Sequence, residues 1–275
     1  MGWLLLLLER RVVPDAPRPP VNEVVLSVGL ARQVALSGPQ LPAILGKWFN
    51  DHPRVETAPP YEIPPEPTEL IGAFQAPSLK LLSQPVPRYW LISPDDQELV
   101  QVQPDYLALN WRFRNESNQY PGYSEMKRRF SDLLETAKNG ILTHQGIFKP
   151  TRAELTYIDV IRPGSLWSSH EDTHKLINVT FPPDAAYEQL SFSYTKKLTI
   201  RNDSFAGRLH VNVTPVVDWI KREPQLKINF TARSVDFQDV DIESVIEFLD
   251  FAHLEIEDSF KRLVSEEALT AWGLT

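Results

Sequence analysis

Apolar and polar residues alternate along several stretches of the first half of the chain, which is typical of β-strands that bury one face. The strands predicted there are Val24–Leu30, Arg88–Ser93, Leu99–Gln103, Tyr106–Arg114 and Leu155–Ile161. Two other segments, Leu41–Phe49 and Met126–Ile141, repeat their apolar residues at helical spacing. Ser124 is a suitable N-cap for the second helix, and Asn139-Gly140 is a suitable end for it.

The second half predicts strands followed by one long helix. The predicted strands are Ile177–Phe181, Leu190–Ile200, Arg208–Val217 and Gln225–Val235. The helix begins near Asp241, and its apolar stripe consists of Ile242, Val245, Ile246, Leu249, Ala252, His253, Ile256, Phe260, Leu263 and Val264. A helix that lies across an antiparallel sheet buries the apolar faces of both. We therefore expect an α+β fold of two antiparallel sheet-plus-helix units, the second a four-stranded sheet packed by the C-terminal helix.

These elements divide the chain into three parts. Residues 1–19 are predicted to be an N-terminal tail, residues 20–161 the first α+β unit and residues 162–275 the second. The first unit contains a proline-rich arm, residues 53–87, with nine prolines. Proline removes a main-chain donor, so this arm cannot hold a continuous helix or a central strand.

Composition narrows the class of protein. With 42% apolar and 10% aromatic residues among 275, the chain is not intrinsically disordered. The lack of cysteine excludes a disulfide scaffold, a cysteine-ligated metal and a cysteine nucleophile. The six apolar residues Trp3–Leu8 are too few for a membrane span or a secretory signal. We expect a soluble, cytoplasmic protein with no membrane contact.

The net charge of −8 is concentrated in one segment. Residues 236–267 contain eleven acids and two bases, so this stretch carries −9 and the rest of the chain +1. The acidic helix could dock a basic partner. The polar faces of the second-half strands carry Lys197, Arg201, His210, Lys227 and Arg233, which could form a cationic platform for nucleic acid. A solvated surface is the favoured interpretation of both features.

Residues His170-Glu171-Asp172-Thr173-His174 match the H-E-x-x-H pattern of zinc peptidases. That chemistry requires both imidazoles on one face of a helix and a third ligand elsewhere. The segment before His170 reads as a loop, the segment after it as a strand, and no convincing third ligand follows. We favour an accidental match over a metal site at His170 and His174.

The most distinctive residues lie in the centre of the chain: Arg88-Tyr-Trp90-Leu-Ile-Ser-Pro-Asp95, Asn110-Trp111-Arg112 and Tyr120-Pro121-Gly-Tyr123. Together with Pro19-Pro20 near the start and His253, Phe260 and Trp272-Gly273 near the end, they resemble an uncharacterised, sporadically distributed family of bacterial proteins of about this length. The resemblance spans residues 19–273 and implies no known reaction. The scattered occurrence of that family suggests a phage-defence or toxin–antitoxin context.

Six residues are candidates for a binding site: Asn110, Trp111, Arg112, Tyr120, Tyr123 and His253. The aromatic residues could simply join the strands to the second helix, and His253 lies on an apolar helix face, where a hydrogen-bonded core histidine is the favoured interpretation. The functional alternative is a pocket in which Asn110 and Arg112 bind an anionic or amide group beside stacked aromatic rings.

These observations favour a non-catalytic binding protein without a cofactor, a regulatory or complex-forming subunit with a protein partner. Two further interactions stay open: assembly into a homo-oligomer, and binding of nucleic acid to the polar face of the second predicted sheet. The first alternative is an enzyme or nucleotide-binding protein that uses the Asn110-Trp111-Arg112 region. The second is a zinc hydrolase that uses His170, Glu171 and His174.

Overall fold

The computed structural model describes residues 19–32, 36, 38–69, 87–115, 119–164, 166–179, 189–200 and 203–274. Residues 1–18 of the predicted tail and residues 70–86 of the predicted arm lie outside this description, as does Arg201 of the predicted cationic platform.

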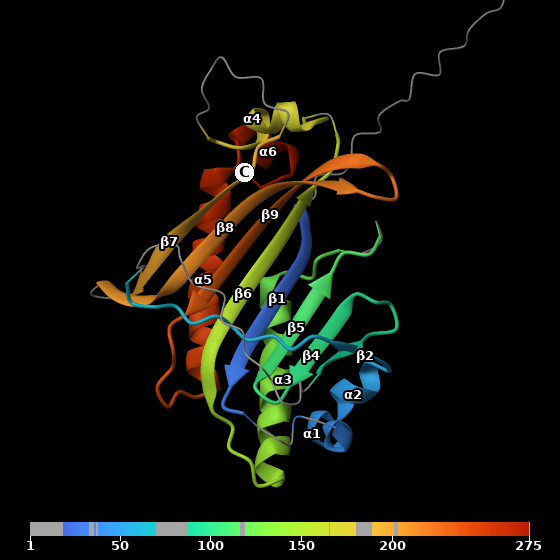
Figure 1. Ribbon diagram of the computed structural model, residues 1–275, viewed down its shortest axis with the longest axis vertical. Coiled ribbons are helices and arrows are strands. Elements are labelled where there is room, and N and C mark those ends of the chain that lie inside the picture. Colours follow the sequence, from blue (N-terminus) through green and yellow to red (C-terminus); the bar gives the residue numbers. More distant parts are fainter. Residues whose placement is uncertain are drawn as a thin grey trace, which may run out of the picture.

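The strands of the described residues form one antiparallel sheet of nine strands, in the order β2-β3-β4-β5-β1-β6-β9-β8-β7 (Figure 1). The strands are β1 (Val21–Leu30), β2 (Arg54–Ala58), β3 (Arg88–Ile92), β4 (Glu98–Gln103), β5 (Tyr106–Arg112), β6 (Pro150–Ile161), β7 (Phe192–Ile200), β8 (Ser204–Asp218) and β9 (Glu223–Ser234). The α-helices are α1 (Leu41–Leu45), α2 (Lys47–Asp51), α3 (Tyr123–Thr143), α4 (Thr173–Leu176), α5 (Ile242–Leu263) and α6 (Glu266–Ala271). The predicted α+β class is confirmed.

The prediction of two sheet-plus-helix units is not confirmed, because β6 of the first predicted unit pairs with β9 of the second and joins both halves into a single sheet. β1 pairs with β5 along one edge and with β6 along the other, from Val21 opposite Asp159 to Leu30 opposite Pro150. The predicted strand at Ile177–Phe181 is wrong in its described part, where Ile177 makes only an isolated bridge to Val264. β9 pairs with β8 on one side and, on the other, with β6 from Glu154 to Ile161.

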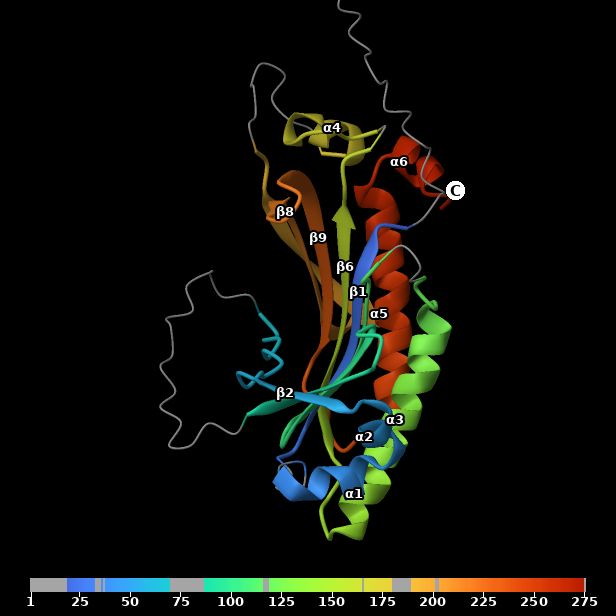
Figure 2. The ribbon, with the colours of Figure 1, turned by 90° about the vertical axis from the view of Figure 1, so that its right-hand side faces the viewer.

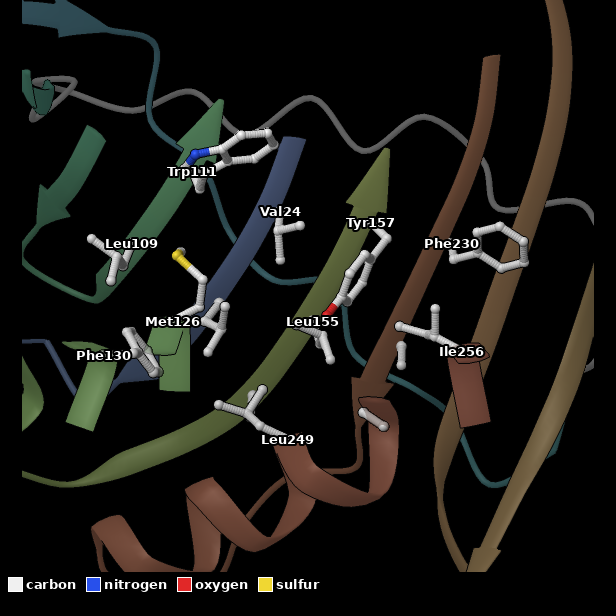
Figure 3. Close-up of a cluster of buried hydrophobic side chains, with 14 of the residues drawn as sticks. Val24, Leu109, Trp111, Met126, Phe130, Leu155, Tyr157, Phe230, Leu249 and Ile256 are labelled. Atoms are coloured by element: carbon white, nitrogen blue, oxygen red, sulfur yellow. The ribbon is translucent and has the colours of Figure 1, made fainter. Parts of the chain in front are cut away.

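The long helices α3 and α5 lie side by side on one face of the sheet (Figure 2). The main apolar core fills the space between them and the strands. Figure 3 shows Leu109, Val24, Leu155 and Phe230 from four neighbouring strands facing helix residues such as Phe130 and Leu249. Burial of each large apolar side chain contributes about 1.5–3 kcal/mol, so this layer supplies most of the driving force for folding.

Helix α3 matches the predicted stripe but not the predicted ends. All six predicted core residues are buried: Met126, Phe130, Leu133, Leu134, Ala137 and Ile141. The N-cap is Gly122 rather than Ser124, and the helix continues through Asn139-Gly140 to Thr143. Helix α1 packs closely against α3 at Gly140, and this contact explains why a glycine is needed inside the helix. A Cβ atom at this position would lie 2.6 Å from the carbonyl oxygen of Ile44.

Substituting alanine for Gly140 is therefore expected to destabilise the protein, although alanine is favoured in a helix by about 1 kcal/mol. Separating α1 from α3 to admit the methyl group should cost about 1–3 kcal/mol. Urea unfolding of Gly140→Ala measures this loss, and Gly164→Ala, whose added methyl group meets no atom within 4 Å, is the matched control. An unfolding midpoint at or above that of the wild type would contradict this packing.

Helix α5 begins where the sequence predicts, because the Asp241 side chain accepts a hydrogen bond from the main-chain N–H of Ser244. Most of the predicted stripe is buried, and Phe248 and Ser259 join it. The helix predicted over Leu41–Phe49 is divided into α1 and α2 at Gly46, which has a φ of 52°. No helix within the described part of the chain is long and apolar enough to cross a membrane.

The sheet face opposite the helices is crossed by an extended segment, residues 59–69, which we call the strap (Figures 1 and 2). The strap belongs to the proline-rich arm and follows β2. It contains Pro59, Pro60, Pro64, Pro65 and Pro67.

Candidate functional site

The structure separates the predicted central pocket into two faces. Successive residues of a strand point to opposite sides of the sheet. Trp111, opposite the core residue Val24, faces the helices, where its ring centroid lies 5.2 Å from that of Tyr120. Asn110 and Arg112 therefore lie on the face that the strap crosses, so the structure does not bring them beside the stacked aromatic rings.

Asn110 and Arg112 are each engaged by neighbouring polar groups. The Asn110 amide donates a hydrogen bond of 2.6 Å to Glu23 and accepts one of 2.8 Å from Gln101. The Arg112 guanidinium lies 2.9 Å from a carboxylate oxygen of Asp96. These contacts join strands and turns of the sheet.

Three other candidate residues do come together, on the helix-facing side. The hydroxyl groups of Tyr120 and Tyr157 are 3.0 Å apart, and the Tyr157 hydroxyl lies 3.1 Å from Nδ1 of His253. The His253 ring stacks on Tyr123 at 3.9 Å, and the Tyr123 hydroxyl donates to Asp250. Burial raises the pKa of both Tyr120 and Tyr157 and lowers the pKa of His253. These directions favour the neutral forms of the two tyrosines and of His253, in keeping with a hydrogen-bonded core histidine.

The H-E-x-x-H residues lie in two short helical turns, a 3-10 helix at His170–Asp172 and α4. Nδ1 of His174 lies 2.9 Å from the main-chain oxygen of Glu171, and the His170 ring packs against Trp167. Among the residues that the structure describes, no cluster of three histidine or acidic side chains could hold a metal ion. The zinc-hydrolase alternative thus has no third ligand in the described chain.

The polar face of the second-half strands carries basic residues, including one that sequence analysis missed. Arg208 on β8 lies directly opposite Arg233 on β9, and His210 lies two residues further along the same face of β8. The alternation that placed His210 on the polar face also places Arg208 there, so this signal was present in the sequence.

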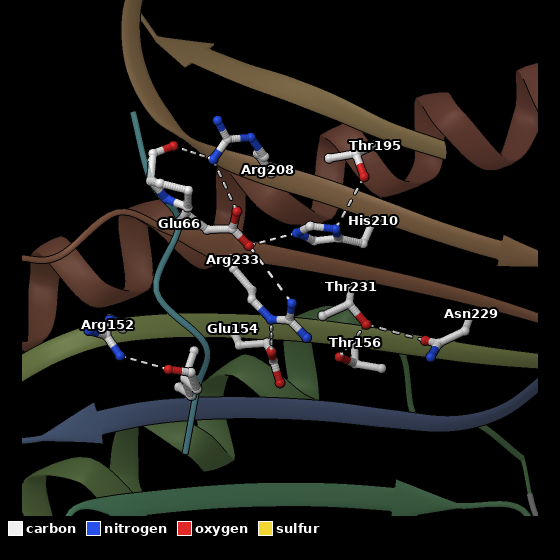
Figure 4. A network of polar contacts seen from close by, with 12 residues as sticks. Glu66, Arg152, Glu154, Thr156, Thr195, Arg208, His210, Asn229, Thr231 and Arg233 are labelled. Carbon is white, nitrogen blue, oxygen red and sulfur yellow. Dashed lines mark hydrogen bonds and ion pairs between the residues drawn. The ribbon is translucent and has the colours of Figure 1, made fainter. Parts of the chain in front are cut away.

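The strap brings an acid onto this positive cluster (Figure 4). The two carboxylate oxygens of Glu66 lie 2.6 Å from Nε2 of His210 and 3.2 Å from Nη1 of Arg208. Arg233 is held at 2.5 Å by Glu154 of β6 and lies 3.8 Å from Glu66. The positive charge of Arg208 and Arg233 is therefore opposed by two carboxylates, Glu66 and Glu154. Glu66 had no signal in the sequence, since it lies far from its partners along the chain.

The β8–β9 hairpin has an apolar tip that projects beyond the end of β6 (Figure 1). β6 ends at Ile161, opposite Leu226, while the hairpin continues to residues 219–222. At this tip Trp219 is 88% exposed and Ile220 is 95% exposed. The Asp218 carboxylate accepts hydrogen bonds from the main-chain N–H groups of Ile220 and Lys221, at 2.9 and 3.1 Å. The turn is thus fixed with both apolar side chains in solvent.

Comparison with known proteins does not assign the chain to a family, because no protein-family model and no curated protein matches it. The resemblance drawn from the central motifs remains a prediction.

Proposed function

We propose that this protein is a non-catalytic, complex-forming subunit that binds a partner protein through the tip of the β8–β9 hairpin. The observation that carries the proposal is the exposure of Trp219 and Ile220 side by side on a turn fixed by Asp218. Neighbouring large apolar side chains on a surface mark interaction sites, and tryptophan is among the residues that contribute most to protein interfaces.

The residues beside the tip indicate the chemistry of the partner. Lys221 and Arg222 follow Ile220 directly, so the apolar pair has positive charge next to it. A complementary surface would present an apolar recess with acidic residues at its rim. Because the turn is already fixed by hydrogen bonds, docking requires little ordering of this loop.

The enzyme or nucleotide-binding alternative, which uses the Asn110-Trp111-Arg112 region, is less favoured here. Asn110 and Arg112 lie on the opposite face of the sheet from Trp111 and Tyr120, so a pocket that combines these four side chains does not support it. A regulatory role, a cytoplasmic location and a defence or toxin–antitoxin context stay part of the proposal, supported by the sequence and the resemblance.

Removing both apolar side chains at the tip is expected to abolish partner binding. The protein would be purified with an affinity tag from its own host, and co-purifying proteins would be quantified by mass spectrometry. A partner recovered with the wild type should fall at least about tenfold with Trp219→Ala/Ile220→Ala, since truncating an interface tryptophan costs about 2 kcal/mol or more. Thermal stability should stay unchanged, because both side chains are exposed.

Leu254→Ala is the matched control for this experiment, because Leu254 is a similarly apolar, 63% exposed residue on α5. That variant should retain the partner in full. Equal recovery of every partner with the tip variant and the wild type would reject the hairpin tip as the binding surface.

A further inference from the structure

The strap contacts the sheet as a bound peptide would, with sheet side chains holding its main chain. Gln103 accepts a hydrogen bond from the Tyr61 N–H at 2.9 Å and donates one to the Tyr61 carbonyl oxygen at 2.5 Å. Arg152 donates to the Ile63 carbonyl oxygen at 2.7 Å, and Arg208 donates to that of Pro67 at 2.5 Å. Main-chain groups at three positions are thus recognised from three strands, β4, β6 and β8, independently of the strap's side chains.

Two strap side chains occupy separate places on the sheet. Ile63 is buried against Tyr106 and Ala108, in an apolar cluster distinct from the main core on the helix side. The Tyr61 ring packs edge-on against Tyr106, and its hydroxyl group lies 3.0 Å from Glu154. An aromatic and an aliphatic side chain are therefore each accommodated by the sheet face.

The third place is a site for a carboxylate. Arg208 and Arg233 are directly opposite on neighbouring strands, an arrangement in which like charges destabilise a sheet. The side chains of Arg208 and Glu66 are each only 4% exposed, so water screens this charge poorly. A buried cation left without a partner is strongly unfavourable, so an extended segment that covers Arg208 must bring an anion to it. Here Glu66 of the strap supplies it.

We propose that the strap-covered face of the sheet is a binding groove for an extended, proline-rich acidic peptide of another protein, and that the strap is its intramolecular occupant. The ligand would carry aromatic, aliphatic and acidic side chains spaced as Tyr61, Ile63 and Glu66. Proline-rich segments suit such a groove because they are extended before binding and lose little entropy. This binding surface is separate from the hairpin tip and does not depend on the function proposed above.

The strap and an external peptide would compete for the groove. A covalently attached occupant acts at an effective concentration in the millimolar range. The wild-type protein should therefore bind an external peptide weakly, and a variant whose strap is loosened should bind it much more tightly.

The test uses the full chain with Glu66→Gln, which keeps the size of the side chain and removes its charge. The probe is a fluorescently labelled synthetic peptide with the sequence of residues 59–69, measured by fluorescence anisotropy. We expect Glu66→Gln to bind this peptide at least about tenfold more tightly than the wild type. A peptide with glutamine at the position of Glu66 should bind at least about tenfold more weakly than the unmodified peptide.

A peptide with glutamine at the position of Glu62 is the matched control, because the Glu62 side chain is 64% exposed and 4.0 Å from Arg152. It should bind within about threefold of the unmodified peptide. Should Glu66→Gln fail to fold by circular dichroism, Ile63→Ala loosens the strap at its apolar contact and receives the same peptides. A folded, loosened variant that binds no peptide would overturn the proposal and show that the strap is a permanent part of the fold.

Binding that ignores the charge at the Glu66 position would also overturn it. The tip variant Trp219→Ala/Ile220→Ala, combined with Glu66→Gln, should bind the peptide as Glu66→Gln alone does. The groove and the hairpin tip are thus tested independently.

Discussion

Replacing Gly207 with alanine is expected to lower the free energy of unfolding by about 4 kcal/mol, from a steric clash combined with backbone strain. Gly207 lies in β8 opposite Ser234 and has a φ of 151°, a conformation that residues with a Cβ atom rarely adopt. A Cβ atom at this position would lie 1.9 Å from the main-chain oxygen of Arg233. Because that oxygen belongs to the neighbouring strand, the clash cannot be relieved by rotating a side chain.

Urea unfolding of Gly207→Ala at neutral pH measures this loss. Gly122→Ala separates its two causes, since Gly122 also has a positive φ, 88°, but its added methyl group would meet no atom within 4 Å. We expect Gly122→Ala to lose only the smaller contribution of backbone strain, about 1–3 kcal/mol. Equal losses in the two variants would show that contact with β9 is not the cause.

Replacing Asp159 with asparagine is expected to remove a pH dependence of stability of about 4 kcal/mol. Asp159 on β6 lies opposite the core residue Ile228 and is only 3% exposed. Its Oδ1 atom has no hydrogen-bond partner among the described residues. Burial disfavours the charged form and raises the pKa of the Asp159 carboxyl from 3.8 to about 7.

The sign follows from the proton that the folded protein retains. Between pH 4 and pH 7 the folded state keeps Asp159 protonated while the unfolded state loses that proton, so the contribution of Asp159 to stability falls as pH rises. Asparagine does not titrate. The difference in unfolding free energy between Asp159→Asn and the wild type should therefore shift in favour of the variant by about 4 kcal/mol between pH 4 and pH 8.

Urea unfolding of both proteins at these two pH values gives this double difference, in which other titrating groups cancel. Asp218→Asn at the hairpin tip is the control, because main-chain hydrogen bonds lower the pKa of that carboxyl. The difference in unfolding free energy between Asp218→Asn and the wild type should not shift in favour of the variant between pH 4 and pH 8. A difference between Asp159→Asn and the wild type that is equal at pH 4 and pH 8 would contradict a buried, protonated Asp159.

Local periodicity predicted much of this fold because it reports which face of an element is buried. It identified the buried stripe of α3, the Asp241 cap of α5 and most of the strands. It does not report which strand lies beside which, so the pairing of β6 with β9 could not be obtained from it. The two-unit description is not confirmed, because this pairing joins the strands of both halves in one sheet.

The candidate site shows the same limit. Alternation along Tyr106–Arg114 already separates Trp111 from Asn110 and Arg112, so the proposed pocket conflicted with a pattern visible in the sequence. Glu66 is different, because its position on the Arg208 and Arg233 pair depends on the path of a proline-rich segment that has no periodicity. The exposure of Trp219 likewise depends on how far the hairpin extends beyond β6, a tertiary property.

The central position of β1 has a consequence for how the protein is made. Val24 pairs with Trp111 on one side and with Tyr157 on the other, so both neighbours of β1 are synthesised long after it. At a translation rate of about 5–20 residues per second, β1 leaves the ribosome several seconds before β5, and β6 follows later still. Throughout that interval an apolar strand with two unpaired edges is exposed to other nascent chains. The yield of folded protein in the cell should therefore depend on chaperones that shield β1 during synthesis.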